Sequence, residues 1–225
     1  MPVDPDAAIE ITAFDWVPPF AAGLVRDLRV RWALEEAGLA YGERLLDATR
    51  RRDADELREQ PFGQVPSFTH GEVRMFESGA IVLHIAEGSE ALMPPDPPGR
   101  ARAVTWVFAA LNSVEPPVAA LSEIDLFHAG EPWALARRPG AEADVCERLQ
   151  QLSSHLGRRD HLEDRFTAGD LMMTTVLRIL RHTDLLERFP NLVRYQARCE
   201  ARPAFVAALQ AQLAALSTRR PAATA

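Results

Sequence analysis

The spacing of the apolar positions changes part-way along the chain. Up to about residue 90, short apolar or alternating runs predict strands, and two longer runs with apolar residues three and four positions apart predict helices. The predicted strands are residues 9–14, 41–46, 66–69 and 73–76, and the predicted helices are residues 24–37 and 78–86. A strand, a helix, a strand, a hairpin and a helix in this order predict a small α/β layer.

The segment MPPDPPG, residues 93–99, contains four prolines and a glycine, which predict a linker. Beyond it only helical spacing remains. The predicted helices are residues 100–121, 142–156, 169–181, 191–201 and 204–216, with a bend or break at Pro116-Pro117 and a frayed tail over 217–225. The predicted organisation is therefore an α/β domain at 1–90, a proline-rich linker at 91–99 and an all-helical domain at 100–225.

Composition and charge narrow the range of partners. The chain is 47% hydrophobic, which allows a sizeable core, and its formal net charge of -7 argues against nucleic acid or an anionic membrane. No apolar run approaches the roughly 18 residues of a membrane span, and the acidic start MPVDPDAAIE does not resemble a signal peptide. Cys146 and Cys199 lack metal-ligand spacing, so we expect no metal and a cytoplasmic location.

The stretch QVPSFTHGEVRMFESGAI, residues 64–81, carries the candidate chemistry. Taken alone, Val65-Pro66 is typical of a trans proline at the start of an edge strand, and Glu77-Ser78 of a helix cap. The same cap offers a second interpretation. A helix start presents free N–H groups to a carboxylate, so an acid beside a hydroxyl can bind a small zwitterionic peptide.

Several motifs occur in one order along most of the chain. They are Val65-Pro66, Phe76-Glu77-Ser78 and Ala80-Ile81, together with RVRWALEEAGLAY at 29–41, FTAGDLMMTTVL at 166–177 and RCEARPAFVAAL at 198–209. With these motifs the chain resembles the cytosolic glutathione transferases, in a bacterial form with an atypical N-terminal loop. The resemblance implies a thioredoxin-like domain followed by a helical bundle domain, glutathione as co-substrate, and a homodimer.

The resemblance also implies a role for each residue of the 64–81 stretch. A cis Val65-Pro66 bond would leave the Val65 backbone free to pair with glutathione as an added strand. Glu77 would bind the α-ammonium and Ser78 the α-carboxylate of the γ-glutamyl group, while Gln64 would reach the glycyl end. The arginines at 50–52 are either partners for the glycyl carboxylate or part of a solvated loop.

A group that activates the thiol is missing from its expected place. Family members place Tyr, Ser or Cys after the first strand, but the corresponding stretch DWVPPFAAGLVRD, residues 15–27, contains no hydroxyl or thiol side chain. Backbone N–H groups at the start of the 24–37 helix, with Arg26 as a weak candidate, are the remaining stabilisers of a thiolate. The catalytic residue is therefore unknown.

Three large apolar side chains in loops, Trp16, Phe20 and Trp133, predict a pocket for a hydrophobic co-substrate. Phe108 and Asn112, on the predicted helix before the Pro116-Pro117 bend, are further candidates for its lining, with plain packing as the alternative. The T-x-x-D sequence Thr167–Asp170 predicts a structural cap.

The leading hypothesis is a transferase that conjugates the glutathione thiolate to a small hydrophobic electrophile. The alternative from another class is a non-catalytic glutathione-binding or protein-interaction module on the same fold. A glutathione-dependent lyase or isomerase is a third possibility.

Overall fold

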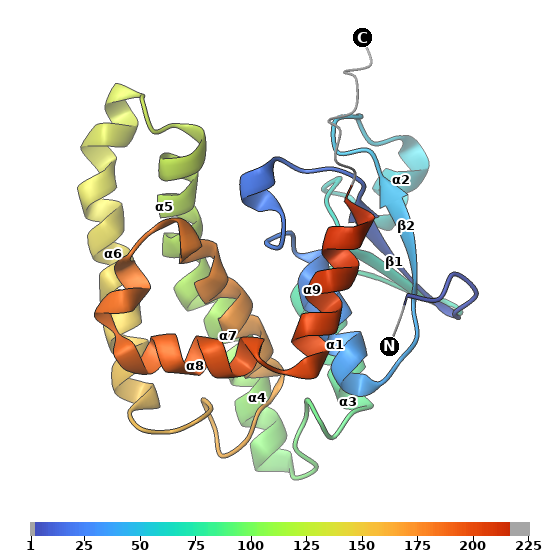
Figure 1. Cartoon of the computed structure of the whole chain (residues 1–225). Coiled ribbons are helices and arrows are strands. Elements are labelled where there is room, and N and C mark those ends of the chain that lie inside the picture. The colour runs from blue at the N-terminus through green and yellow to red at the C-terminus, as the bar shows by residue number, and fades with distance from the viewer. Residues whose placement is uncertain (1–2, 217–225) are drawn as a thin grey trace. The chain divides into compact units, whose positions relative to one another are not determined.

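The computed structural model of the chain describes residues 3–216, so the predicted frayed tail lies outside the described residues. The described chain divides into two compact units (Figure 1). Unit 1 contains residues 3–92 and 202–216, and unit 2 contains residues 93–201. Each unit has its own set of elements and its own buried side chains.

Unit 1 is built on a four-stranded sheet. Its strands are β1 (Ile9–Phe14), β2 (Gly42–Leu46), β3 (Ser67–His70) and β4 (Val73–Phe76), in the order β2-β1-β3-β4. β1 pairs parallel with β2 and antiparallel with β3, and β3 pairs antiparallel with β4. Gly71 has a φ of 60° in the turn between β3 and β4, where a residue without Cβ fits best. The predicted strands and hairpin are thus confirmed, and the fold is thioredoxin-like.

Three helices of unit 1 come from the first part of the chain: α1 (Asp27–Ala37), α2 (Ala54–Glu59) and α3 (Ser78–Glu87). α1 joins the parallel pair β1 and β2, as a crossover must. It begins at Asp27 rather than at Leu24, because a tight turn closed by the Leu28 N–H on the Val25 carbonyl precedes it. It ends at Gly38 with φ 68°, as the sequence predicts.

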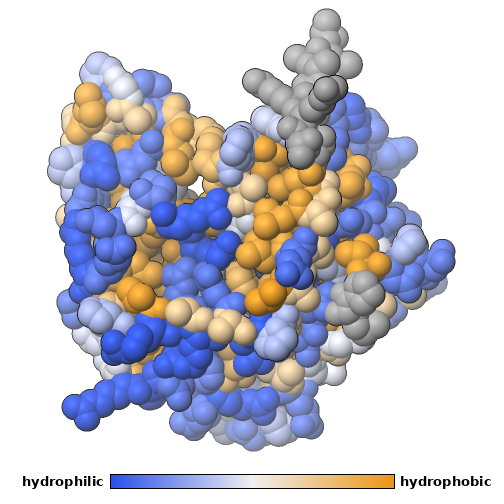
Figure 2. Space-filling model, viewed as in Figure 1, coloured by the Kyte–Doolittle hydropathy of each residue, from blue (hydrophilic) through white to orange (hydrophobic). Residues whose placement is uncertain are grey.

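The last helix, α9 (Pro203–Ala215), lies with unit 1 rather than with the other C-terminal helices. Buried Gln212 donates to Asp27 Oδ1 at 2.6 Å on α1, and the Trp32 and Phe205 rings meet edge to face with centroids 4.8 Å apart. Figure 2 shows apolar side chains gathered along the outer side of α9. α9 thus groups with residues 3–92 because it packs on α1, whereas the predicted all-helical domain included it.

Unit 2 is entirely helical. Its helices are α4 (Pro97–Ala109), a π-helical turn at Ala110–Val114, α5 (Glu115–Phe127), α6 (Pro132–Leu156), α7 (Ala168–Arg178) and α8 (Pro190–Glu200), with short 3-10 turns at Ile179–His182 and Leu185–Arg188. Pro116-Pro117 lie in the first turn of α5, where a missing N–H costs least. The predicted irregularity is therefore the π-helical turn just before them.

α7 is the central helix of unit 2, and its residues Ala168–Leu177 are all buried. Gly169 permits a close approach to α4, since a Cβ added there would lie 2.4 Å from the Trp106 Cβ. Trp106 itself donates to Glu163 at 2.9 Å and packs on the His155 ring. Trp106 therefore serves packing within unit 2.

One helical stretch in residues 3–216, Pro97–Phe127, is long and apolar enough to cross a membrane by length and composition. The most apolar 18-residue segment of this stretch has a mean hydropathy of 1.2, and 33% of that segment is buried. A core helix of a soluble protein passes the same test of length and composition. The expectation of no membrane partner stays a prediction.

Candidate functional site

The Val65-Pro66 bond is cis, as predicted. Val65 lies just before β3 and its residue surface is only 6% exposed. In the described part of the chain, neither backbone polar group of Val65 makes a hydrogen bond. By contrast, the Ser67 N–H donates to the buried Thr12 hydroxyl at 2.7 Å. The Val65 backbone therefore retains a donor and an acceptor for an extended ligand.

Glu77 stands between β4 and α3 in an unusual backbone conformation. Its φ is 70° and its ψ is 109°, and it is the one non-glycine residue with positive φ among residues 3–216. Such a conformation costs of order 1–3 kcal/mol and clusters at functional sites. Within the described chain the Glu77 side chain makes no capping hydrogen bond to α3. The interpretation of Glu77 as a helix cap is therefore wrong for this structure.

Ser78 is the first residue of α3, and its residue surface is 4% exposed. Its hydroxyl accepts a hydrogen bond from Arg29 Nη1 on α1 at 3.3 Å. Arg29 is itself only 3% exposed. Sequence reasoning missed Arg29, since it lies 49 positions from Ser78 and no local spacing connects the two.

At the start of α3, several backbone N–H groups have no hydrogen-bond acceptor within the described residues. The first helical hydrogen bond runs from the Ile81 N–H to the Glu77 carbonyl at 3.0 Å. The N–H groups of Ser78, Gly79 and Ala80 have no acceptor within residues 3–216. Together with the helix dipole, these donors favour an anion such as a carboxylate.

Gln64 is exposed and lies between Gly63, with φ 67°, and Val65. The neighbouring arginines are more engaged than the solvated-loop interpretation expects. Arg52 donates to the Asp47 carbonyl at 2.8 Å and stacks over Phe14, with 5.4 Å from its Cζ to the ring centroid. Arg52 is therefore a structural residue.

The loop between β1 and α1 carries Arg26, the weak candidate for thiol activation, and two residues predicted for the hydrophobic pocket, Trp16 and Phe20. Trp16 is half-buried, and Phe20 is 37% exposed in a 3-10 turn at Pro19–Ala21. Arg26 is exposed at the N-cap of α1. The chain has no Tyr, Ser, Thr or Cys from residue 13 to residue 40.

The first residue of α1, Asp27, already places a carboxyl group at that helix start. Burial raises the pKa of Asp27, although Arg31 at 2.8 Å and Gln212 at 2.6 Å lower it. The Arg29 N–H is taken up by the Arg26 carbonyl at 3.1 Å. The start of α1 is therefore less open to an anion than the start of α3.

The five residues predicted for a hydrophobic pocket are divided between the units. Trp16 and Phe20 belong to unit 1, whereas Phe108, Asn112 and Trp133 belong to unit 2. Phe108 on α4 is 51% exposed and Trp133 is 49% exposed. Trp133 lies in the first turn of α6 rather than in a loop, because Pro132 begins that helix. A pocket shared by the five stays a prediction.

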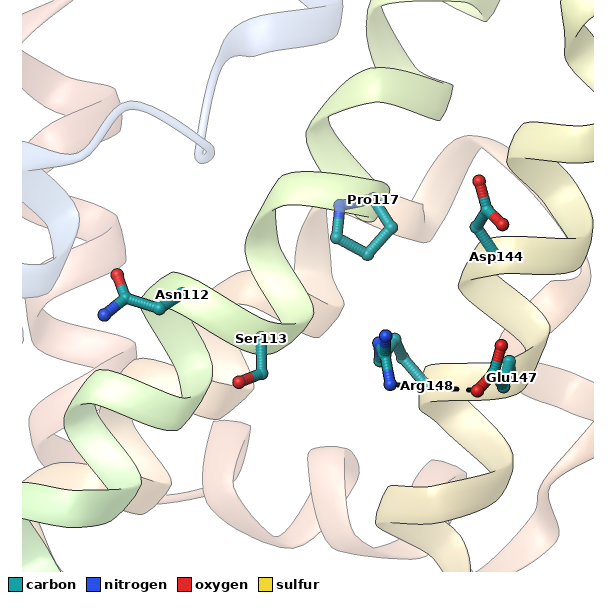
Figure 3. A pocket seen from close by; sticks show the side chains of 6 residues that line it. All are labelled: Asn112, Ser113, Pro117, Asp144, Glu147 and Arg148. Atoms are coloured by element: carbon teal, nitrogen blue, oxygen red, sulfur yellow. Dashed lines mark ion pairs between the residues drawn. The ribbon is translucent and has the colours of Figure 1, made fainter.

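Within unit 2, Asn112 does border a cleft of about 430 Å³ between the π-helical turn and α6 (Figure 3). The other residues that line it are Ser113, Pro117, Asp144, Glu147 and Arg148. The lining is polar, and Arg148 pairs with Glu147 at 3.9 Å. In Figure 3 the Asn112 amide points away from α6. This polar cleft does not fit the predicted hydrophobic co-substrate.

The Thr167–Asp170 sequence forms the predicted structural cap at the start of α7. Asp170 accepts hydrogen bonds from the N–H groups of Thr167 and Leu162, both at 2.9 Å, and from the Tyr195 hydroxyl at 3.0 Å. The Gly169 N–H is bound to the Thr167 hydroxyl at 3.2 Å. Side-chain oxygens of Thr167 and Asp170 thus accept hydrogen bonds from these N–H and O–H groups.

Neither Cys146 nor Cys199 forms a disulfide within the described residues, and Cys199 is buried. Among residues 3–216, no group of three or more His, Cys, Asp or Glu residues lies close enough together to hold a metal ion. The expectation of no metal stays a prediction.

The sequence is similar to that of known proteins over most of its length. The family described as glutathione S-transferase, N-terminal domain, matches residues 11–87. A glutathione S-transferase of Hyoscyamus muticus is 30% identical over 165 residues, which are 67% of this chain and 76% of the relative. The glutathione S-transferase PARB of Nicotiana tabacum is 28% identical over 174 residues, 68% of this chain and 77% of the relative.

The fold is also similar to that of solved structures. A glutathione transferase from Burkholderia graminis, with two glutathione molecules bound per subunit, superposes with a TM-score of 0.79. It is 23% identical, and the match covers 90% of this chain and 87% of that one. At this identity the likeness establishes the fold alone.

Proposed function

Because this chain belongs to the glutathione S-transferase family, we propose that it is an enzyme that conjugates glutathione to a small hydrophobic electrophile. The observation that carries the proposal is the surface formed by Val65, Glu77 and Ser78, which we name the glutathione corner. It joins free backbone groups at Val65 to free N–H groups at the start of α3. The relatives named glutathione S-transferases support the choice of ligand.

Glutathione fits the glutathione corner by its chemistry. The backbone of Val65 pairs with the cysteinyl backbone, as in an added strand. The α-carboxylate of the γ-glutamyl group lies on the N–H groups and hydroxyl at the start of α3, and Glu77 binds its α-ammonium. Gln64 binds the glycyl end. The ligand's opposite charges thus meet opposite partners.

The bound thiol then loses its proton to solvent water, and the thiolate sulfur attacks the electrophilic carbon. A carbon–sulfur bond forms while the carbon–leaving group bond breaks, and the leaving group departs with the bonding electron pair. No side-chain hydroxyl or thiol between residues 13 and 40 is present to assist. In this proposal the thiolate is stabilised by backbone N–H groups of the loop between β1 and α1 rather than by the occupied start of α1, and Arg26 is the candidate cation.

The test combines glutathione binding by calorimetry with turnover on a panel of generic electrophiles. We expect binding, turnover, and ultraviolet thiolate absorbance that titrates below the free thiol pKa of about 8.5. The Arg26→Gln variant should raise that pKa and leave glutathione affinity intact only at pH values below the bound thiol pKa, where the thiol keeps its proton. No binding of glutathione would contradict the proposal.

The second candidate is a non-catalytic glutathione-binding or protein-interaction module. The absence of any hydroxyl or thiol side chain from residue 13 to residue 40 favours it. Binding with an unshifted thiol pKa and no turnover would establish this alternative. The same calorimetric and spectroscopic measurements therefore separate the two candidates.

We also propose a homodimer in the cytoplasm, which the family resemblance implies. Unit 1 offers an exposed aromatic pair for a second copy: Phe62 is 68% exposed and meets Phe76 edge to face at 6.2 Å. Sedimentation equilibrium should give twice the chain mass. Phe62→Glu should shift the mass toward the monomer, and a monomeric natural chain would contradict the proposal.

A further inference from the structure

The hydrogen bond between Arg29 and Ser78 fixes which way the Ser78 proton can point. A hydroxyl has one proton and two acceptor positions, whereas a guanidinium has donors only. Arg29 Nη1 lies 3.3 Å from the Ser78 Oγ, so Oγ must be the acceptor in this contact. The single Ser78 proton is then left for another partner.

We propose that Arg29 is a positioning residue that makes Ser78 a dedicated hydrogen-bond donor to the α-carboxylate of the γ-glutamyl group. This inference rests on the proposed glutathione binding. With one of its two acceptor positions occupied by Arg29, the Ser78 hydroxyl turns its proton to the carboxylate and donates alongside the N–H groups of Ser78 and Gly79. Three donors then converge on one carboxylate, and a carboxylate accepts only.

Burial makes the arrangement specific. Arg29 and Ser78 are 3% and 4% exposed, so water competes little for either group. Arg29 comes from α1 and Ser78 from α3, which pack against each other within unit 1. Arg29 also takes part in an interaction other than its hydrogen bond to Ser78. The orientation of the hydroxyl is therefore set before the ligand binds.

The experiment measures the dissociation constants of three ligands by calorimetry. They are glutathione, an analogue with 4-aminobutanoyl in place of γ-glutamyl, which lacks the α-carboxylate, and an analogue with glutaryl, which keeps the carboxylate and lacks the ammonium. For Arg29→Met we expect about tenfold weaker binding of glutathione and of the glutaryl analogue. Binding of the 4-aminobutanoyl analogue should stay within about twofold.

Arg31→Met is the matched control on the same helix. Arg31 is fully buried but contacts Asp27 and Glu43 instead of Ser78. Its loss should lower stability and leave the ratio of the dissociation constants of the analogues unchanged. If either methionine variant fails to fold, Arg29→Lys and Arg31→Lys repeat the comparison with the charge retained.

The Ser78→Ala background tests whether Arg29 acts through the hydroxyl. In the Ser78→Ala variant, Arg29→Met should cause no further change in the ratio of the dissociation constants of the two analogues. Equal weakening of all three ligands by Arg29→Met, or an undiminished effect of Arg29→Met without the Ser78 hydroxyl, would overturn the inference. If the natural chain binds glutathione and the ratio is unmoved, only this inference fails. If it does not bind glutathione, the proposed function fails as well.

Discussion

The start of α7 and the start of α3 are built from similar side chains and reach opposite results. At α7, Thr167 and Asp170 take up N–H groups, and Asp170 also accepts from Leu162 and Tyr195. At α3, an acid and a hydroxyl are again present, yet in the described structure neither caps the helix. A helix start closed by its own chain stabilises the fold, while one left open keeps its donors for a ligand.

The largest expected effect comes from removing the Asp170 carboxylate, which accepts hydrogen bonds at the start of α7. Asp170→Ala would remove the carboxylate that accepts hydrogen bonds from the N–H groups of Leu162 and Thr167 and from the Tyr195 hydroxyl. Since each of these three bonds to a buried charged group contributes about 1.5–3 kcal/mol, we expect the free energy of unfolding to fall by about 4 kcal/mol or more. Urea unfolding measures the change. An unchanged free energy of unfolding would show that the hydrogen bonds of Asp170 at the start of α7 do not stabilise the fold.

Ser78→Ala and Thr167→Ala form a matched pair, because each deletes one hydroxyl at a helix start. Both should cost about 1 kcal/mol of stability, Thr167 through its cap and Ser78 through its bond to Arg29. Only Ser78→Ala should weaken glutathione binding, by about tenfold or more. Equal glutathione affinity in the two variants would show that the two starts do not differ in function.

The pH dependence of stability provides a third comparison. Burial raises the pKa of Asp170 above 3.8, although the bonds from Leu162 and Thr167 lower it. The folded state therefore holds the proton more tightly, and this stabilisation is complete below the unfolded pKa. It is lost as pH rises through the folded pKa, with a slope of at most about 1.4 kcal/mol per pH unit.

Asp170→Asn removes this titration. The free energy of unfolding of the natural chain minus that of Asp170→Asn should fall as pH rises above 3.8. Urea unfolding at several pH values measures the difference. A difference that rises with pH would mean that the hydrogen bonds, and not burial, determine the direction of the Asp170 pKa shift.

The smallest expected effect is a gain in stability. Glu77 has φ 70°, and Glu77→Gly relieves this conformation while it adds entropy to the unfolded chain. We expect a net stabilisation of about 1 kcal/mol, with glutathione binding weakened through loss of the carboxylate. Thermal unfolding and calorimetry measure the two changes. Lower stability would show that Glu77 makes contacts that outweigh its strain.

Local spacing explains which features the sequence could predict. The Thr167–Asp170 cap, the hairpin at Gly71 and the end of α1 at Gly38 each depend on residues close together in the chain. Val65-Pro66, Glu77 and Ser78 were identified through the resemblance, and the cis bond is confirmed. Their roles toward glutathione stay predictions.

Contacts between distant segments were not predictable from spacing. Arg29 and Ser78 are 49 positions apart, and Gln212 and Asp27 are 185 apart. Both pairs depend on how helices pack after they have formed. Trp133 was placed in a loop because the apolar periodicity of α6 is weak near its start, where Pro132 begins the helix.

The placement of α9 has a consequence for how the protein is made. Asp27 and Trp32 near one end of the chain contact Gln212 and Phe205 near the other. A ribosome releases these segments far apart in time, at roughly 5–20 residues per second. Unit 2 is one continuous segment between α1 and α9. All of its residues are therefore synthesised before α9, while the surface of α1 that packs on α9 is still uncovered. In the cell, α1 thus spends part of synthesis as an exposed apolar surface, open to chaperones until α9 arrives.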